Sequence, residues 1–136
     1  MFSTETKLKV RYSETDQMGF VYYGNYAAYY EVGRVEMMRE LGISYKEMEA
    51  KGCMMPIVNL SVRYLKPAHY DDTLRIKTMV HQMPDKNMFF QYEIYNDVTG
   101  KLLNLGETKL AFVNISTRKP MRAPEWFLEL VSAKLK

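Results

Sequence analysis

Hydrophobic positions recur along the chain with two different spacings. In residues 6–12 alternate side chains are apolar, which predicts a half-buried strand. In residues 25–41 the apolar or small side chains lie three or four positions apart, which predicts an amphipathic helix. The stretch between them, residues 13–24, is polar and contains glycine, so we expect a long loop. A strand, a loop and a helix therefore open the predicted fold.

Capping residues indicate where the predicted helices begin and end. Asn25 suits the N-cap of the long helix, and Gly42 stands just past its last residue, where a left-handed conformation is wanted. Ser44 and Glu47 have the spacing of a capping box, which predicts a second, short helix. Gly52 is expected to end that helix.

The rest of the chain is predicted to consist mostly of strands. Apolar and polar residues alternate over residues 58–64, 74–80, 88–94 and 102–115, with turn-forming residues between them. A closing helix is expected from Pro124. Consecutive hairpins imply antiparallel pairing, so the fold class is α+β, with one sheet packed against the long helix. One helix cannot cover the whole sheet, so a second subunit is expected to close an edge or a face.

Length, composition and charge narrow the class of protein. The 136 residues, 47% of them hydrophobic, suit a single globular domain spanning residues 1–136. No window approaches the roughly 20 consecutive apolar residues of a membrane-spanning helix. The first residues lack the features of a signal peptide, so a cytoplasmic location is expected. Cys53 is the single cysteine and cannot form an internal disulfide. A net charge of +3 argues against nucleic acid as a main partner.

Residues 12–26 carry the most chemical information. They place a carboxylate, Asp16, in a loop shortly before the start of the long helix. The first turn of a helix presents unpaired N–H groups and a partial positive charge, which stabilise an oxyanion forming on a carbonyl. A carboxylate nearby could attack that carbonyl or activate a water toward it. From spacing alone, the simpler interpretation is structural: Asp16 makes an Asx-type turn and Gly19 supplies a left-handed bend.

Two motifs change this balance. The first comprises Glu14-Thr15-Asp16, Gly19, Val21-Tyr22, Asn25-Tyr26, Glu31 and Arg34, and the second comprises residues 62–68, Asp71-Asp72 and Leu74. Together they resemble the small hotdog acyl-CoA thioesterases of the 4-hydroxybenzoyl-CoA thioesterase family. The resemblance covers essentially the whole chain.

The resemblance implies a hotdog fold, in which a long central helix is wrapped by a five-stranded curved antiparallel sheet. It also implies dimers whose sheets join edge to edge, with active sites at subunit interfaces. Asp16 matches the family's catalytic base or nucleophile, and the backbone N–H groups of Tyr23 and Gly24 match those that polarise the thioester carbonyl. Many bacterial relatives have His where this chain has Tyr23, so any proton transfer by that His is absent or altered here.

Substrate contacts are expected both around this site and from more distant segments. We assign them to Gly19, Val21, Asn25, Asn59, Ser61, Arg118 and Lys119. Arg118 and Lys119 are adjacent cations after the last long strand that could meet the phosphates of coenzyme A. A solvated basic turn fits the same two residues equally well.

Several competing chemistries lack the residues they need. His69 and His81 have no partner at metal-ligand spacing, so we expect no metal site. No separate cofactor is expected, since coenzyme A is part of the substrate. No serine stands in a nucleophile elbow, and no Gly-rich phosphate loop is present. Glu31 and Arg34 could pair with each other or with a neighbour, and we expect them to be structural.

Three functions are consistent with these residues. The first is hydrolysis of a short-chain, medium-chain or aryl acyl-CoA to the free acid and CoA. The second is a hotdog dehydratase or hydratase, which needs a His that the sequence does not place near Asp16. The third is a non-catalytic module that binds acyl thioesters. The sequence leaves open a carrier-protein thioester as substrate, a homodimer or a homotetramer, and water attack or a covalent intermediate.

Overall fold

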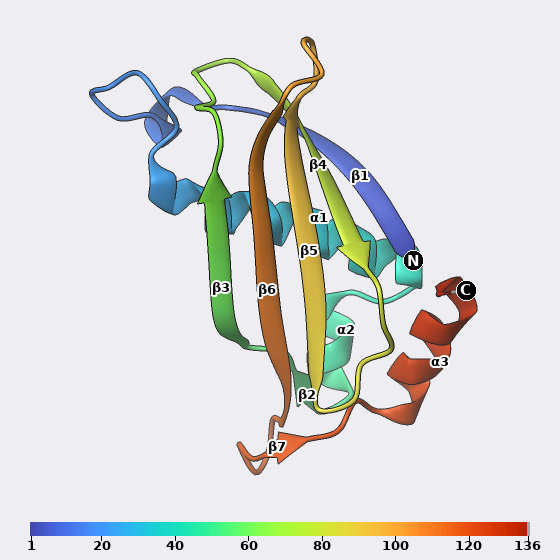
Figure 1. Cartoon of the computed structure of the whole chain (residues 1–136). Coiled ribbons are helices and arrows are strands. Elements are labelled where there is room, and N and C mark those ends of the chain that lie inside the picture. Colours follow the sequence, from blue (N-terminus) through green and yellow to red (C-terminus); the bar gives the residue numbers. More distant parts are fainter. Residues whose placement is uncertain (136) are drawn as a thin grey trace.

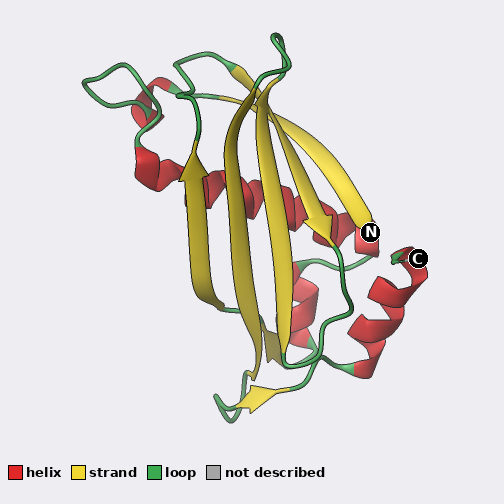
Figure 2. Ribbon diagram, viewed as in Figure 1, coloured by secondary structure: helices red, strands yellow, loops and turns green. Residues whose placement is uncertain are grey.

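One long helix crosses the concave face of a curved antiparallel sheet in the computed structural model, which describes residues 1–135 (Figures 1 and 2). The strands are β1 (Phe2–Lys9), β2 (Cys53–Met54), β3 (Ile57–Tyr64), β4 (Thr73–Val80), β5 (Asn87–Asn96), β6 (Leu102–Asn114) and β7 (Pro120–Met121). The helices are α1 (Tyr26–Leu41), α2 (Tyr45–Ala50) and α3 (Glu125–Lys134), with one-turn 3₁₀ helices at Tyr12–Glu14 and Tyr23–Asn25. The predicted α+β class is confirmed.

Within residues 1–135 the sheet contains seven strands rather than the five that were predicted. The five long strands follow the order β1, β4, β5, β6 and β3, all antiparallel. The two additional strands, β2 and β7, have two residues each and pair with the end of β6. Strands this short carry no measurable period, so hydrophobic alternation could not reveal them.

The first strand begins and ends earlier than predicted. It covers Phe2–Lys9 and pairs along its whole length with β4, whose residue Thr73 lies opposite Lys9. Tyr12, predicted to be in the strand, instead starts a 3₁₀ turn and is 77% exposed. The end of the partner strand, rather than the polar and apolar alternation, therefore decides where β1 stops.

The helix termini show which capping predictions hold. Gly42 follows α1 in the left-handed conformation, with φ +99°, and Ser44 and Glu47 form the predicted capping box of α2. Asn25 does precede α1, but its side chain does not cap the helix. It donates instead to the carbonyl of Glu14, 2.8 Å away. This residue ties the loop before α1 to the helix.

Two glycines allow α1 to lie close to the sheet. A Cβ on Gly33 would stand 2.4 Å from Oγ1 of Thr78, and a Cβ on Gly106 would stand 2.2 Å from Cζ of Tyr30. Neither distance is possible for real atoms, so a side chain at either position would push the helix away from the sheet. The buried ring of Tyr30 also stacks on Tyr92, with ring centroids 4.4 Å apart. This packing fixes the helix, and with it the position of its N-terminus.

Arg34 is buried in the core, 4% exposed, and does not pair with Glu31. Its guanidinium donates to the hydroxyls of Tyr45 and Tyr92, each at 3.1 Å. The Tyr92 hydroxyl also contacts Thr108 Oγ1 at 2.6 Å. Arg34 therefore links α1, α2 and β5, which agrees with the structural role expected for it.

Candidate active site

Asp16 lies in a tight turn between the two 3₁₀ helices. Its N–H donates to the carbonyl of Phe20 at 2.9 Å, and its carbonyl accepts from Gly19 N–H at 3.1 Å. Oδ1 of Asp16 accepts from the backbone N–H of Met18 at 2.9 Å, and Gly19 has φ +85°. The Asx-type turn and the left-handed bend are thus both present. Oδ2 of Asp16 has no hydrogen-bond partner within residues 1–135, so this oxygen is available for chemistry.

Glu14 anchors the turn to α1. Its Oε1 accepts from the N–H of Arg11 at 2.8 Å and from the hydroxyl of Tyr29 at 3.0 Å. Its Oε2 accepts from the Arg11 guanidinium at 3.1 and 3.2 Å. Its carbonyl accepts from Tyr22 N–H and from the Asn25 side chain, each at 2.8 Å. Glu14 therefore joins both ends of the loop to the helix.

The charge of Glu14 responds to this environment. Partial burial raises the pKa of the Glu14 carboxyl, but the hydrogen bonds from Arg11 N–H, Tyr29 and the Arg11 guanidinium together hold it below its ordinary value. Burial, and then the bond to Glu14, raises the pKa of Tyr29. The pair is therefore a carboxylate accepting from a neutral phenol near neutral pH.

The start of the helix leaves two backbone donors without acceptors. The 3₁₀ turn Tyr23–Asn25 leads directly into α1, and Asn25 N–H donates to the Tyr22 carbonyl at 2.9 Å. In the described chain, the N–H groups of Tyr23 and Gly24 donate to no protein acceptor. A Cβ on Gly24 would meet the Tyr22 ring at 2.8 Å, so this position favours glycine. Unpaired donors at a helix N-terminus suit a developing negative charge.

A hollow of about 270 Å³ opens beside these groups. Asp16 and Tyr23 line it from the loop and the helix start, and Tyr26 lines it from α1. Tyr64 and Lys66 line it from the end of β3 and the following turn. The remaining lining residues are Met18, Phe20, Val21, Leu65 and Pro67. The wall is thus largely aromatic and aliphatic, with one carboxylate and one cation.

The structure brings some of the predicted site residues together and separates others. Asp16, Val21 and Tyr23 line the hollow, while Gly19, Gly24 and Asn25 shape the loop and helix start around it. Asn59 and Ser61 lie on the exposed strand β3 and line two other hollows, which do not include Asp16.

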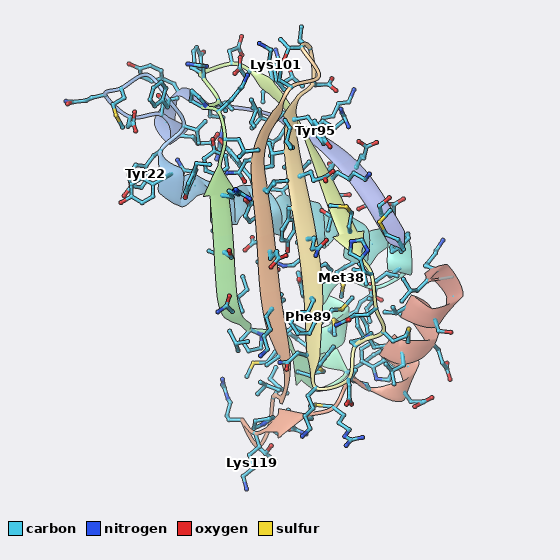
Figure 3. The ribbon with its side chains drawn as sticks, viewed as in Figure 1. Tyr22, Met38, Phe89, Tyr95, Lys101 and Lys119 are labelled. Carbon is cyan, nitrogen blue, oxygen red and sulfur yellow. The ribbon has the colours of Figure 1, made fainter. Side chains whose placement is uncertain are left out.

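Arg118 and Lys119 follow β6 at the opposite end of the sheet. Figure 3 shows Lys119 far from Tyr22, which lies beside the helix start. On β6, Asn104 pairs with Tyr64 at the end near the hollow. Asn114 is the last residue of β6, at the end near Arg118 and Lys119. Asn114 is ten positions after Asn104 along β6, which is about 33 Å at the usual rise per residue. Within one subunit these two cations do not reach the hollow, and their contact with CoA stays a prediction.

Seven of the ten lining residues were not assigned as site residues from the sequence, and Tyr64 and Lys66 are the two of them with polar groups contributed from β3 and the turn after it. Both belong to the motif at residues 62–68, so the signal was present as part of the family resemblance. Their distance from Asp16 along the chain concealed their place in the site. Within residues 1–135, no group of three or more His, Cys, Asp or Glu side chains could hold a metal ion. In the same range no helix is both long and apolar enough to cross a membrane.

Comparison with known proteins finds thioesterases among the relatives of this chain. Residues 10–131 match the family model of the thioesterase-like superfamily. The putative acyl-CoA thioesterase YneP of Bacillus subtilis is 34% identical, over 98% of this chain and 99% of its own length. The acyl-CoA thioester hydrolase YbgC of Escherichia coli is 32% identical, over 87% of each chain. The solved structure of DHNA-CoA thioesterase from Staphylococcus aureus is 36% identical, with a TM-score of 0.90, over 98% of this chain and 91% of that one.

Proposed function

Since this chain belongs to the thioesterase-like superfamily, we propose that it hydrolyses the thioester of a small aromatic acyl-CoA in the hollow beside Asp16. One observation carries the proposal. Asp16, whose Oδ2 has no hydrogen-bond partner in the described chain, and Tyr23 line the same hollow, and the unpaired N–H groups of Tyr23 and Gly24 lie next to each other at the adjoining helix start. A carboxylate beside an oxyanion site is the pair of groups that acyl transfer to water requires.

The reaction would place the thioester carbonyl at the helix start. The N–H groups of Tyr23 and Gly24, with the positive end of α1, would stabilise the negative charge that develops on the carbonyl oxygen. Asp16 Oδ2 would take a proton from an attacking water, or attack the carbonyl carbon itself. In the second route water then hydrolyses the acyl-aspartate anhydride. In both routes the C–S bond breaks, the CoA thiolate gains a proton, and the acid leaves.

The lining of the hollow supports an aromatic acyl group. The aromatic residues Phe20, Tyr23, Tyr26 and Tyr64 line it, and the rings of Tyr26 and Tyr64 pack edge to face, with centroids 5.5 Å apart. An aryl ring gains from such offset and edge contacts as well as from burial. The volume of about 270 Å³ is close to the lower limit of roughly 300 Å³ for small-molecule sites, which favours a compact acyl group. Short aliphatic acyl-CoAs are the alternative substrates. The assay described below also includes carrier-protein thioesters.

The edge of the sheet at β3 supports a homo-oligomer. In the described part of the chain, β3 pairs with β6 alone, so its other edge is open. Five large apolar residues on and just after β3 are 42% to 53% exposed. They are Ile57, Val58, Leu60, Tyr64 and Leu65. An open apolar edge is normally covered, and a second copy joined edge to edge would cover it. The hollow lies at the end of this same strand, so the partner would help to close the site.

The Asp16→Asn variant tests the proposed role of Asp16. Asn keeps Oδ1 as the acceptor for Met18 N–H, so the turn persists, but Asn is neither a base nor a nucleophile. We expect kcat for release of CoA thiol to fall at least ~100-fold, about 2.7 kcal/mol of barrier, with the thermal midpoint and acyl-CoA affinity nearly unchanged. The assay compares benzoyl-CoA, aliphatic acyl-CoAs of graded length and an acyl carrier protein thioester. A folded variant that retains more than about a tenth of the activity would show that Asp16 is only a turn residue.

A further inference from the structure

Tyr64 reaches across the hollow to the backbone of the helix start. Its hydroxyl donates to the carbonyl oxygen of Tyr23 at 3.1 Å, although the two residues lie 41 positions apart. The same carbonyl also accepts the N–H of Tyr26, the bond that closes the 3₁₀ turn. Tyr64 is the last residue of β3, so this contact joins the edge strand to the start of α1.

The hydrogen bond from Tyr64 matters because the Tyr23 carbonyl is in the same peptide unit as the N–H of Gly24. The C=O of Tyr23 and the N–H of Gly24 belong to one planar peptide unit, so fixing the carbonyl also fixes the direction of that N–H. Tyr23 N–H lies on the other side of the same Cα, so φ and ψ of Tyr23 together set the angle between the two donors. A hydrogen bond to a peptide carbonyl also polarises the unit, which strengthens its N–H as a donor.

We propose that Tyr64 is a positioning residue that holds the Tyr23–Gly24 peptide in the orientation needed to stabilise the oxyanion. This inference rests on the proposed thioester hydrolysis, in which the Tyr23 and Gly24 N–H groups bind the carbonyl oxygen. The hydroxyl acts through the backbone and touches no reacting atom. Burial, and then the neighbouring Tyr23, raises the pKa of Tyr64, so the phenol stays protonated and keeps its role as donor near neutral pH.

A purely structural role for the hydroxyl is less consistent with its surroundings. The Tyr23 carbonyl also accepts the N–H of Tyr26, so loss of the Tyr64 hydroxyl leaves no unpaired acceptor and costs folding little. Its ring packs against Tyr26 whether or not the hydroxyl is present. Removing the hydroxyl alone therefore separates the bond to the Tyr23 carbonyl from the packing of the hollow.

The experiment compares wild type, Tyr64→Phe and a matched control, Tyr70→Phe. Tyr70 is 56% exposed, lies outside the hollow, and its hydroxyl holds no described backbone group. Loss of one net hydrogen bond on the oxyanion peptide should lower kcat of Tyr64→Phe by about 3- to 10-fold. We expect KM for benzoyl-CoA within about twofold, as for an interaction made in the transition state. The control should keep wild-type kcat, and both variants should keep the wild-type thermal midpoint.

A second measurement follows the stretching frequency of the substrate's thioester carbonyl. Benzoyl-CoA with ¹³C at the thioester carbonyl is bound to Asp16→Asn, which stalls the chemistry, and to the double variant that also carries Tyr64→Phe. Isotope-edited infrared difference spectra should show the carbonyl stretch lowered by binding to Asp16→Asn. Part of that lowering should be lost in the double variant, because the donor peptide is less well oriented.

The outcomes separate this inference from the proposed function. If wild type releases thiol and Tyr64→Phe has the same kcat, the proposed hydrolase function is retained and the positioning role of Tyr64 is overturned. A raised KM with unchanged kcat, or activity lost in proportion to the thermal midpoint, would also overturn it, since Tyr64 would then be a wall or a fold residue. An identical carbonyl stretch in both Asp16→Asn backgrounds would do the same. No thiol release by wild type on any thioester would remove the proposed function, and this inference with it.

Discussion

Glu14 offers the sharpest test of how the loop around Asp16 is held. Changing it to Ala removes the two bonds on Oε1, from Arg11 N–H and Tyr29, and the two from the Arg11 guanidinium on Oε2. The Arg11 side chain is 79% exposed, so the ion pair contributes little, at most about 0.5 kcal/mol. Each bond on Oε1 is made to a charged acceptor and is worth about 1.5 kcal/mol. The expected loss is therefore about 3 kcal/mol.

Glu14→Gln is the conservative variant, because its amide oxygen can replace Oε1 as acceptor for Arg11 N–H and Tyr29. Neutral acceptors give weaker bonds, so we expect a loss of about 1 kcal/mol. For a chain of this length, 1 kcal/mol lowers the thermal midpoint by about 3–4 °C, so Ala should cost about 10 °C and Gln about 3–4 °C. Glu40→Ala, which removes an exposed carboxylate from α1, should leave the midpoint unchanged.

The functional consequence should exceed the loss of stability. A shift of the turn by even 1 Å would misplace Asp16, and such displacements cost up to about 100-fold in rate. We expect kcat for thiol release to fall at least ~10-fold in Glu14→Ala and no more than about threefold in Glu14→Gln. The assays are thermal unfolding and steady-state kinetics on the same preparations. A folded Glu14→Ala enzyme with wild-type kcat would refute the view that this carboxylate places Asp16.

The depressed pKa of Glu14 adds a pH test. The folded state binds a proton at Glu14 less readily than the unfolded chain, so its stabilisation is present above the unfolded pKa of about 4.3. It is lost as pH falls through the lower, folded pKa. The midpoint of wild type should therefore exceed that of Glu14→Gln at pH 7, and the gap should narrow as the pH falls below the unfolded pKa of Glu14. A gap that does not depend on pH would show that the charge of Glu14 contributes nothing.

Two further predictions concern assembly and coenzyme A. Sedimentation at micromolar concentration should show a homo-oligomer. Leu60→Lys on the β3 edge should release monomer with reduced turnover. A wild-type monomer would contradict both the covered edge and an active site at the subunit interface. Arg118 and Lys119 lie far from the hollow of their own subunit, but twofold antiparallel pairing of β3 edges would bring this end of one subunit beside the helix start of its partner. Changing both to Ala should raise KM for acyl-CoA more than it lowers kcat, with a weaker dependence on salt, whereas an unchanged KM would indicate a solvated turn.

Local sequence signals predicted the elements that frame the site. The helix at residues 26–41, the left-handed Gly42 and the capping box of Ser44 and Glu47 all depend on residues within one or two turns of each other. The Asx-type turn at Asp16 is equally local. The family resemblance drawn from two motifs is confirmed by the match over residues 10–131, and the hotdog fold with it. The roles of individual site residues stay predictions.

Contacts between distant residues could not be predicted in the same way. Tyr29 donates a hydrogen bond to Glu14, and Tyr64 donates one to the Tyr23 carbonyl. Both contacts depend on strand register and on the close packing of α1 against the sheet at Gly33. Arg34 was expected to be structural, but its phenol partners could not be named from its own helix.

The sequence by itself determined the helices, most of the strands and the turn that presents Asp16, because periodicity and capping act between neighbours in the chain. The tertiary structure alone decided where β1 ends, that Tyr64 lines the hollow, and that Arg118 lies at the far end of the sheet. Those outcomes depend on how strands pair. A strand's register is set by its partner, and a shift of one residue would send every side chain to the other face.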